Sequence, residues 1–312
     1  MSYKRLSEIE SIPIVRASTS FDELDFIYGY SEYQGQWMWG MPKGKISLWA
    51  GTSGIGKSRL AIDVAKNCSL RGEVLYFQTE SSLEDFAGWT KDSSLYPNLY
   101  CSSDNKIDDI TKTILQVKPK LVIIDSVNEV AEFVNGNKQE ARRIIHGLEP
   151  ETLQDSPWVI FHNGLKHAAD FVGCHIILLG QLNQDGTIKG GTSLPHLVDI
   201  HFELKPYSGC KNIFAVSVGI KHRYGRRDDS IYGAWQHKED GVKCVTDNRL
   251  SDEKWCESNG LQYMNRGERM SYLLHQDEEY VALCNNVGQN EYVAPKENKF
   301  KSFVRYLFTP QE

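Results

Sequence analysis

An eight-residue segment of the chain has the residue types and spacing of a phosphate-binding loop (P-loop). Residues 51–58 read Gly-Thr-Ser-Gly-Ile-Gly-Lys-Ser, which fills every fixed position of the pattern G-x-x-x-x-G-K-[ST]. Glycines let the backbone wrap closely around phosphate groups, and amide N–H groups at the start of a helix supply positive potential. The expected nucleotide contacts come from Gly51, Thr52, Ser53, Gly54, Ile55, Gly56, Lys57, Ser58 and Arg59.

The fixed residues of this loop predict ATP and Mg²⁺ as cofactors. Lys57 can reach the β- and γ-phosphate oxygens, and the hydroxyl of Ser58 is a ligand for Mg²⁺. Such a site also needs a carboxylate on a neighbouring strand to hold the hydrated metal. Asp125 directly follows the apolar run at residues 121–124 and is the candidate. A helix cap is its alternative role.

Hydrolysis requires a further group that orients or deprotonates the attacking water. Glu80 lies just after the apolar run at residues 74–77, and the carboxyl ends of parallel strands face the ligand crevice in α/β sheets. Glu84, one helical turn later, is the competing carboxylate. We prefer Glu80.

The pattern of apolar residues predicts the elements that position these side chains. A strand is expected over residues 45–50, a helix over 58–70, and further strands at 74–77, 121–124 and 175–179. These runs are continuously apolar, which is typical of strands covered on both faces in a parallel sheet. A helix is expected to begin at Ser156-Pro157 and to continue through Val172. After Gly190, shorter runs at 197–204, 213–220 and 231–237 predict antiparallel edge strands.

The alternation of strands and helices predicts an α/β, doubly wound fold with a mainly parallel sheet. We expect three parts: an N-terminal linker or interface segment at 1–35, an ATPase domain at 36–247, and a small C-terminal extension at 248–312 whose role the sequence does not indicate.

Composition excludes several classes of protein. The chain has 312 residues, with 41 acidic and 35 basic side chains and a net charge of -6, which argues against bulk coating of nucleic acid. The N-terminus does not read as a signal peptide, and no apolar run is long enough to span a membrane. The seven cysteines form no C-x-x-C pair, which argues against a zinc ribbon or a disulfide framework. A cytoplasmic protein with no membrane partner is therefore expected.

Taken together, the motifs resemble the RecA-like P-loop ATPases, and among them the RadA/Sms family of DNA repair and recombination factors. The resemblance covers about residues 18–247. Residues 19–25 (TSFDELD) are similar to the family's T-G-x-x-E-L-D, residues 41–47 to its approach to the first strand, and residues 195–199 (PHLVD) to L-E-H-M-V-D. The full-length family also has an N-terminal zinc finger and a C-terminal Lon-like domain. We expect neither in this chain, and residues 31–40 look like an insertion carrying Trp37 and Trp39.

The resemblance also implies roles for individual residues. Glu80 falls at the family's catalytic glutamate, and Gln181 at its γ-phosphate sensor, where RadA usually has His and DnaB-type helicases have Gln. Residues 221–225 (KHRYG) are similar to K-N-R-F-G, a motif at the interface between protomers. By this resemblance, Lys221 and Arg223 act on the nucleotide of a neighbouring subunit, so we expect a homo-oligomer in the form of a hexameric ring or filament. The alternative for these residues is a solvated hairpin end.

Contact with single-stranded or branched DNA is expected from a few basic side chains. Lys189 lies among Gly186, Gly190 and Gly191 in a loop suited to approach a DNA backbone. The other candidates are Arg142, Arg143, Arg226 and Arg227. For Arg142 and Arg143, a solvated helix face is an equally good interpretation.

The preferred function is a DNA-stimulated ATPase that moves on DNA in recombination or repair, with helicase or branch-migration activity. A recombinase or replication protein is a possible further partner. One alternative is a DnaB-type replicative ring helicase. Another, from a different class, is an ATP-switched regulatory or assembly protein without DNA binding, which the acidic pI of about 5.9 leaves open.

Overall fold

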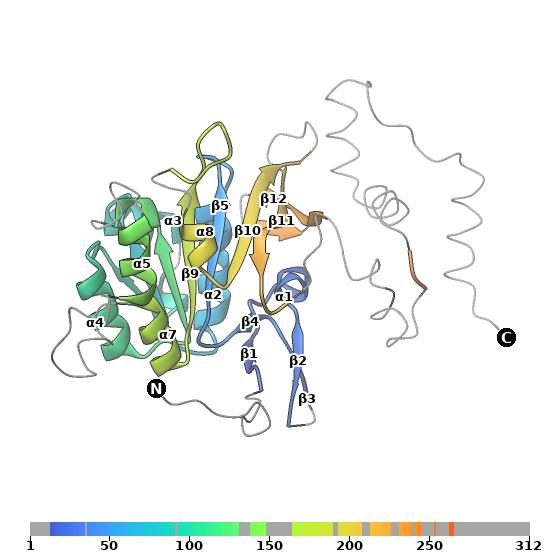
Figure 1. The fold of residues 1–312 in the computed structure, drawn as a ribbon, viewed down its shortest axis with the longest axis horizontal. Coiled ribbons are helices and arrows are strands. Elements are labelled where there is room, and N and C mark those ends of the chain that lie inside the picture. The colour runs from blue at the N-terminus through green and yellow to red at the C-terminus, as the bar shows by residue number, and fades with distance from the viewer. Residues whose placement is uncertain are drawn as a thin grey trace.

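The computed structural model places a nine-stranded sheet at the centre of the part of the chain that it describes (Figure 1). The described residues are 13–34, 36–90, 93–130, 138–147, 164–189, 193–207, 213–225, 231–238, 241–244, 253 and 262–264. The strand order is β13-β12-β11-β10-β5-β9-β8-β6-β7. The strands are β5 (Ile46–Gly51), β6 (Val74–Gln78), β7 (Leu99–Ser102), β8 (Leu121–Asp125), β9 (His175–Gln181), β10 (Ile200–Pro206), β11 (Ile213–His222), β12 (Ile231–Lys238) and β13 (Gly241–Cys244).

The sheet is parallel from β10 to β7 and antiparallel from β10 to β13. This confirms the predicted α/β fold with a mainly parallel sheet and antiparallel edge strands. The expectation that residues 197–204 form an antiparallel strand is wrong on one side, because β10 runs parallel to β5, with Ile200 opposite Ser47. The connection from β9 includes helix α8 (Leu194–Leu197) and is long enough to return the chain for parallel pairing.

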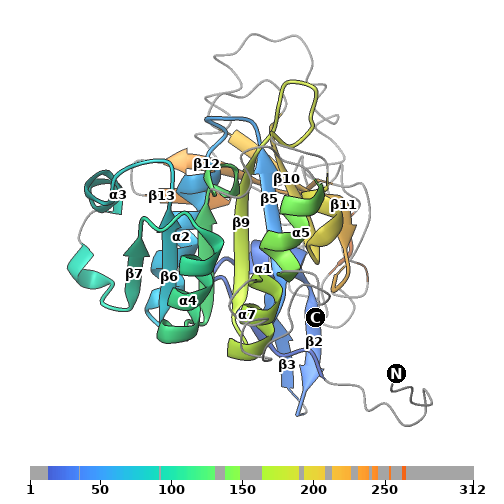
Figure 2. The same ribbon diagram turned by 60° about the vertical axis from the view of Figure 1, so that its left-hand side comes forward.

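Helices cover both faces of the sheet (Figures 1 and 2). On one face lies α2 (Lys57–Ser69), whose Leu60, Ala61 and Val64 are fully buried. On the other face lie α4 (Ile107–Val117), α5 (Lys138–His146) and α7 (Leu165–Val172). Each face has its own apolar core, so the continuously apolar strands are buried on both sides, as a parallel sheet requires.

The remaining short elements are α3 (Leu83–Thr90), η2 (Ser93–Leu95) and η3 (Val127–Glu129). The expected helix from Ser156 begins outside the described residues, and its described part is α7. No helix within the described ranges is long and apolar enough to cross a membrane. Most of the predicted extension at 248–312 also lies outside the described residues.

The N-terminal segment packs into the core. Strand β1 (Arg16–Ala17) pairs with β4 (Met41–Pro42), helix α1 (Asp22–Tyr28) follows, and β2 (Tyr30–Tyr33) pairs with β3 (Gln36–Trp39). Leu24, Ile27 and Tyr28 join the same apolar core as α2, so this part is more than a linker. A seven-residue helix is too short for a clear periodic pattern, which is why the sequence did not predict it. The boundaries at 35 and 247 stay predictions.

Candidate nucleotide-binding site

The P-loop connects β5 to α2, near the middle of the sheet. Gly54 and Gly56 have φ angles of 77° and 106°, a region that L side chains rarely adopt, and α2 begins at the next residue, Lys57. The Lys57 ammonium is buried in the loop, where it donates hydrogen bonds to the carbonyls of Gly51 (2.9 Å) and Thr52 (3.0 Å). Burial lowers the pKa of Lys57, and the nearby Asp125 and Glu80 oppose that shift. A bound phosphate would favour the charged form in the same way.

Asp125, at the end of β8, meets Ser58 of the P-loop. The two side chains are hydrogen-bonded, which brings together the pair predicted to hold Mg²⁺. The hydroxyl of Tyr76 on β6 donates a 2.7 Å hydrogen bond to Oδ2 of Asp125. Burial raises the pKa of Asp125, while its bonds to Ser58 and Tyr76 lower it. Tyr76 was not singled out from the sequence, because its apolar surroundings indicate only a core position.

The oxygen donors of this pair fit a magnesium ion. Mg²⁺ prefers oxygen ligands and usually combines one or two protein groups with waters and substrate phosphates. No group of three His, Cys, Asp or Glu side chains that could hold a metal occurs among the residues that the structure describes. Ser58 and Asp125 would supply the protein ligands, and waters and nucleotide phosphates the others.

Glu80 and Gln181 come into direct contact although they are far apart in the sequence. The Gln181 amide donates a 2.7 Å hydrogen bond to Oε1 of Glu80, and Ser126 Oγ donates a second one of 2.6 Å. Gln181 ends β9 directly beside Gly51 of the P-loop. The competing Glu84 lies exposed in the first turn of α3.

Asn128 links this site to the loop that follows β9. Its Oδ1 accepts a 2.7 Å hydrogen bond from the backbone N–H of Gln181, and its amide donates to the carbonyl of Lys189. The sequence around Asn128 does not indicate this link, because nothing local shows that β8 and β9 are adjacent. Lys189 is exposed at this point.

The predicted interface residues Lys221 and Arg223 lie near the amino end of β10, whereas the P-loop lies at the carboxyl end of the neighbouring strand β5. The end of β11 pairs with the start of β10, with His222 opposite Ile200, whereas the P-loop residue Gly51 is opposite Leu204. Four residues along a strand span about 13 Å. Within one chain, these side chains and the P-loop are therefore kept apart.

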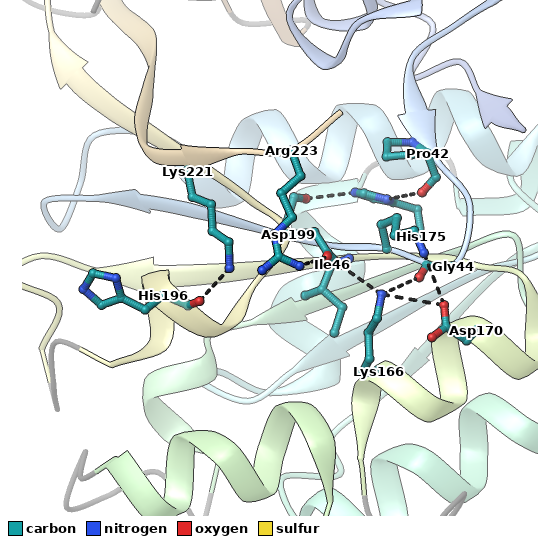
Figure 3. Close-up of polar contacts among 12 residues, drawn as sticks. Pro42, Gly44, Ile46, Lys166, Asp170, His175, His196, Asp199, Lys221 and Arg223 are labelled. Carbon is teal, nitrogen blue, oxygen red and sulfur yellow. Dashed lines mark hydrogen bonds and ion pairs between the residues drawn. The ribbon is translucent and has the colours of Figure 1, made fainter. Parts of the chain in front are cut away.

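Both predicted interface residues already have partners in their own chain (Figure 3). Lys221 Nζ donates a 2.6 Å hydrogen bond to the carbonyl of His196, and Arg223 Nη1 lies 3.6 Å from Oδ1 of Asp199. Burial lowers the pKa of Lys221, and Arg223 lowers it further. The Asp199 side chain is 6% exposed and the Arg223 side chain 58%.

Asp199 is the centre of this cluster. Its Oδ2 accepts hydrogen bonds from Lys166 Nζ and from the backbone N–H of Ile46, both 3.1 Å long. Lys166 also contacts the carbonyl of Gly44 and Asp170. The motif at 195–199 contained Asp199, but only the fold shows that it joins β5, α7 and the end of β11.

The other predicted DNA-binding residues divide into three cases. Arg142 is exposed on α5. Arg143 turns toward α4, where its guanidinium lies 3.9 Å from Asp108. Arg226 and Arg227 lie outside the described residues.

Comparison with known proteins agrees with this geometry. Residues 32–187 match the family described as the AAA domain. The chain is 29% identical over 242 residues to the DNA repair protein RadA of Mycolicibacterium smegmatis, a match that covers 73% of this chain and 45% of that protein. It is 28% identical over 240 residues to RadA of Mycobacterium tuberculosis (73% and 43%) and 22% identical over 228 residues to RadA of Streptococcus pneumoniae (72% and 48%).

The chain thus matches less than half the length of each of these relatives. Residues 32–187, which match the family, include the P-loop, Asp125 and Gln181, and the fold brings these to the carboxyl ends of neighbouring parallel strands. With half of the chain matched by the family profile, the protein belongs to the AAA-domain family and is a RecA-like P-loop ATPase similar to RadA.

Proposed function

We propose that this protein forms a homo-oligomer that hydrolyses ATP between its subunits and uses that reaction to act on single-stranded or branched DNA in repair or recombination. The observation that carries the proposal is that Lys57 lies at the other end of the strands from Lys221 and Arg223. Lys57 lies at the carboxyl end of β5, and Lys221 and Arg223 lie at the amino end of β10. One chain alone cannot bring both to the same phosphate, but a neighbouring copy can.

In this proposal, each residue at the P-loop edge has a distinct task. The Lys57 ammonium leaves its two carbonyl partners for the phosphate oxygens, and Ser58 and Asp125 hold the hydrated Mg²⁺. The bound ion neutralises negative charge on the phosphates. Tyr76 keeps Asp125 in place through its hydroxyl proton.

Glu80 is proposed to orient and deprotonate the attacking water. Among the described residues, the hydrogen bonds from Ser126 and Gln181 to this carboxylate both end on Oε1, so Oε2 can accept the proton. Gln181 contacts Glu80 at one side and lies next to Gly51 at the other, so its amide can respond to the γ-phosphate and pass that response to Glu80. Arg223 or Lys221 of the next subunit would then neutralise charge that develops at the transferred group.

The test is the ATPase rate with and without single-stranded DNA, on a sample whose oligomeric state has been measured. We expect oligomers, a higher rate with DNA, and DNA binding that weakens as salt rises, because phosphate contacts release counterions. An unchanged rate together with salt-independent binding would overturn the DNA role and favour an ATP-switched regulatory protein. Unwinding of a forked duplex without a recombinase would favour the DnaB-type alternative, in which Gln at position 181 is usual.

A further inference from the structure

Strand β12 brings a histidine into contact with the back of the P-loop. His237 Nε2 lies 3.2 Å from the carbonyl oxygen of Ile55, and the imidazole also packs against Phe214 at 5.0 Å between ring centroids. A Cβ atom on Gly56 would collide with the imidazole ring. Glycine at this position is therefore required by the neighbouring ring as well as by its positive φ angle.

The hydrogen bond to Ile55 determines the direction of the next N–H group. The peptide bond between Ile55 and Gly56 is trans, so its C=O and N–H groups point in opposite directions. A donor that holds the carbonyl toward β12 turns the Gly56 N–H away from β12. Loops of this pattern bind phosphates through such backbone N–H groups.

Further contacts hold the hairpin formed by β12 and β13 against α2. Asp63 Oδ2 accepts a 2.7 Å hydrogen bond from the backbone N–H of Val242 on β13, and Arg59 contacts the carbonyl of Lys238 at 3.4 Å. His237 is thus presented by a strand whose position is set by the helix that the P-loop opens. The contact with Ile55 differs from the others because it reaches the loop backbone itself.

We propose that His237 is a positioning residue for nucleotide phosphates, acting by orienting the Ile55–Gly56 peptide. It does not touch the nucleotide in this proposal. The inference rests on the nucleotide-binding part of the proposed function and does not depend on DNA.

The test measures ADP affinity, and separately ATP turnover, for His237→Leu. Loss of one oriented hydrogen bond predicts ADP binding about 3- to 10-fold weaker. KM for ATP should rise by a similar factor with kcat nearly unchanged, because ground state and transition state share the contact. His237→Gln keeps an amide donor at a similar reach and should recover affinity to within about twofold.

Asp63→Ala is the matched control, because it weakens the hairpin contact without touching the loop. It should lower the melting temperature and weaken ADP binding less than His237→Leu does, because the contact between His237 and Ile55 is retained. Equal affinity for His237→Leu and the unaltered protein, an equal loss in Asp63→Ala, or no recovery with Gln would overturn the proposal. If the Leu variant does not fold, His237→Asn, too short to reach Ile55, must show the same weaker binding. A lack of DNA stimulation would overturn the proposed function alone, whereas a lack of ADP binding by the unaltered protein would overturn both.

Discussion

The two ends of the central strands hold their cations in different ways. At the carboxyl end, buried Lys57 donates to two backbone carbonyls, which are neutral acceptors. At the amino end, Arg223 is paired with the carboxylate of Asp199. An anion at the carboxyl end needs to displace only carbonyls, whereas Arg223 must leave an ion pair before it can reach a phosphate. That pair is partly exposed, and such pairs contribute at most about 1 kcal/mol.

The two regions therefore differ in what a phosphate must displace: neutral carbonyls at Lys57, and a carboxylate at Arg223. At the P-loop, the hydrogen-bond acceptors of the Lys57 ammonium are neutral carbonyls, so a phosphate can replace them without breaking an ion pair. At the amino end of β10, Arg223 is paired with Asp199, and Lys221 donates to the carbonyl of His196. In the proposed function, Arg223 acts on a nucleotide only when a second subunit lies against this region.

The largest effect is expected from Arg223→Ala, which tests whether Arg223 acts on the nucleotide of a neighbouring subunit. Arginine residues that act across an interface contribute about 10³ to 10⁵ in rate, so turnover should fall by about 10³ or more with ATP binding retained. Mixing this variant with Lys57→Ala should restore part of the activity, because a Lys57→Ala subunit supplies the missing Arg223 to a neighbour with an intact P-loop. ATPase assays over a range of mixing ratios measure this. No recovery at any ratio would contradict action across the interface.

A second variant tests the carboxyl end alone. Glu80→Gln should bind ATP normally and turn it over about 10²- to 10⁴-fold more slowly, because the amide cannot accept the proton of the attacking water. Single-turnover hydrolysis and nucleotide binding separate the two effects. Glu84→Gln is the control, and a normal rate in Glu80→Gln combined with a slow rate in Glu84→Gln would move the base to Glu84.

The amino end is also expected to be sensitive to acid. His222 donates to the carbonyl of Ile27 at 2.9 Å, and burial lowers its pKa to about 4, from a usual value of about 6.5. The folded state favours neutral His222, so this contribution to stability is present above pH 6.5 and is lost as pH falls toward 4. At pH 5 the loss is about 2 kcal/mol.

Urea unfolding at pH 7.5 and pH 5 checks this expectation. His222→Gln should lose about 2 kcal/mol less than the parent between these two pH values, because no proton can be taken up at the altered position. His196→Gln, which changes an exposed side chain, is the control and should follow the parent. Identical pH dependence in parent and His222→Gln would rule out this source of acid sensitivity.

The smallest effect is expected from Asp199→Asn. Asparagine can still accept from the Ile46 N–H, but it loses the charge that holds Lys166 and Arg223. The free energy of unfolding should fall by about 1–2 kcal/mol, because hydrogen bonds from the charged Lys166 and Arg223 to a neutral amide oxygen are weaker than those to a carboxylate. Asp170→Asn removes an exposed partner of the same Lys166 and should change stability by less than about 0.5 kcal/mol. Equal losses in the two variants would show that Asp199 has no special position.

Much of the site followed from local patterns, and the missed parts have a common cause. The P-loop, Asp125 and Glu80 were found because each follows a recognisable apolar strand. Tyr76 and Asn128 were missed because their roles depend on which strands are neighbours. His237 was missed for the same reason, since β12 and the P-loop are about 180 residues apart in the chain.

The amino-acid sequence by itself determined the α/β fold and the phosphate site, because strand hydrophobicity and the glycine-lysine pattern act over a few consecutive residues. Tertiary structure alone decided that Gln181 meets Glu80, that Asp199 holds Arg223, and that His237 supports the P-loop. It also placed Lys221 and Arg223 near the amino end of β10, away from the P-loop. These features depend on strand order and direction. Both arise from packing between segments that are distant in the chain, so no short stretch of sequence predicts them.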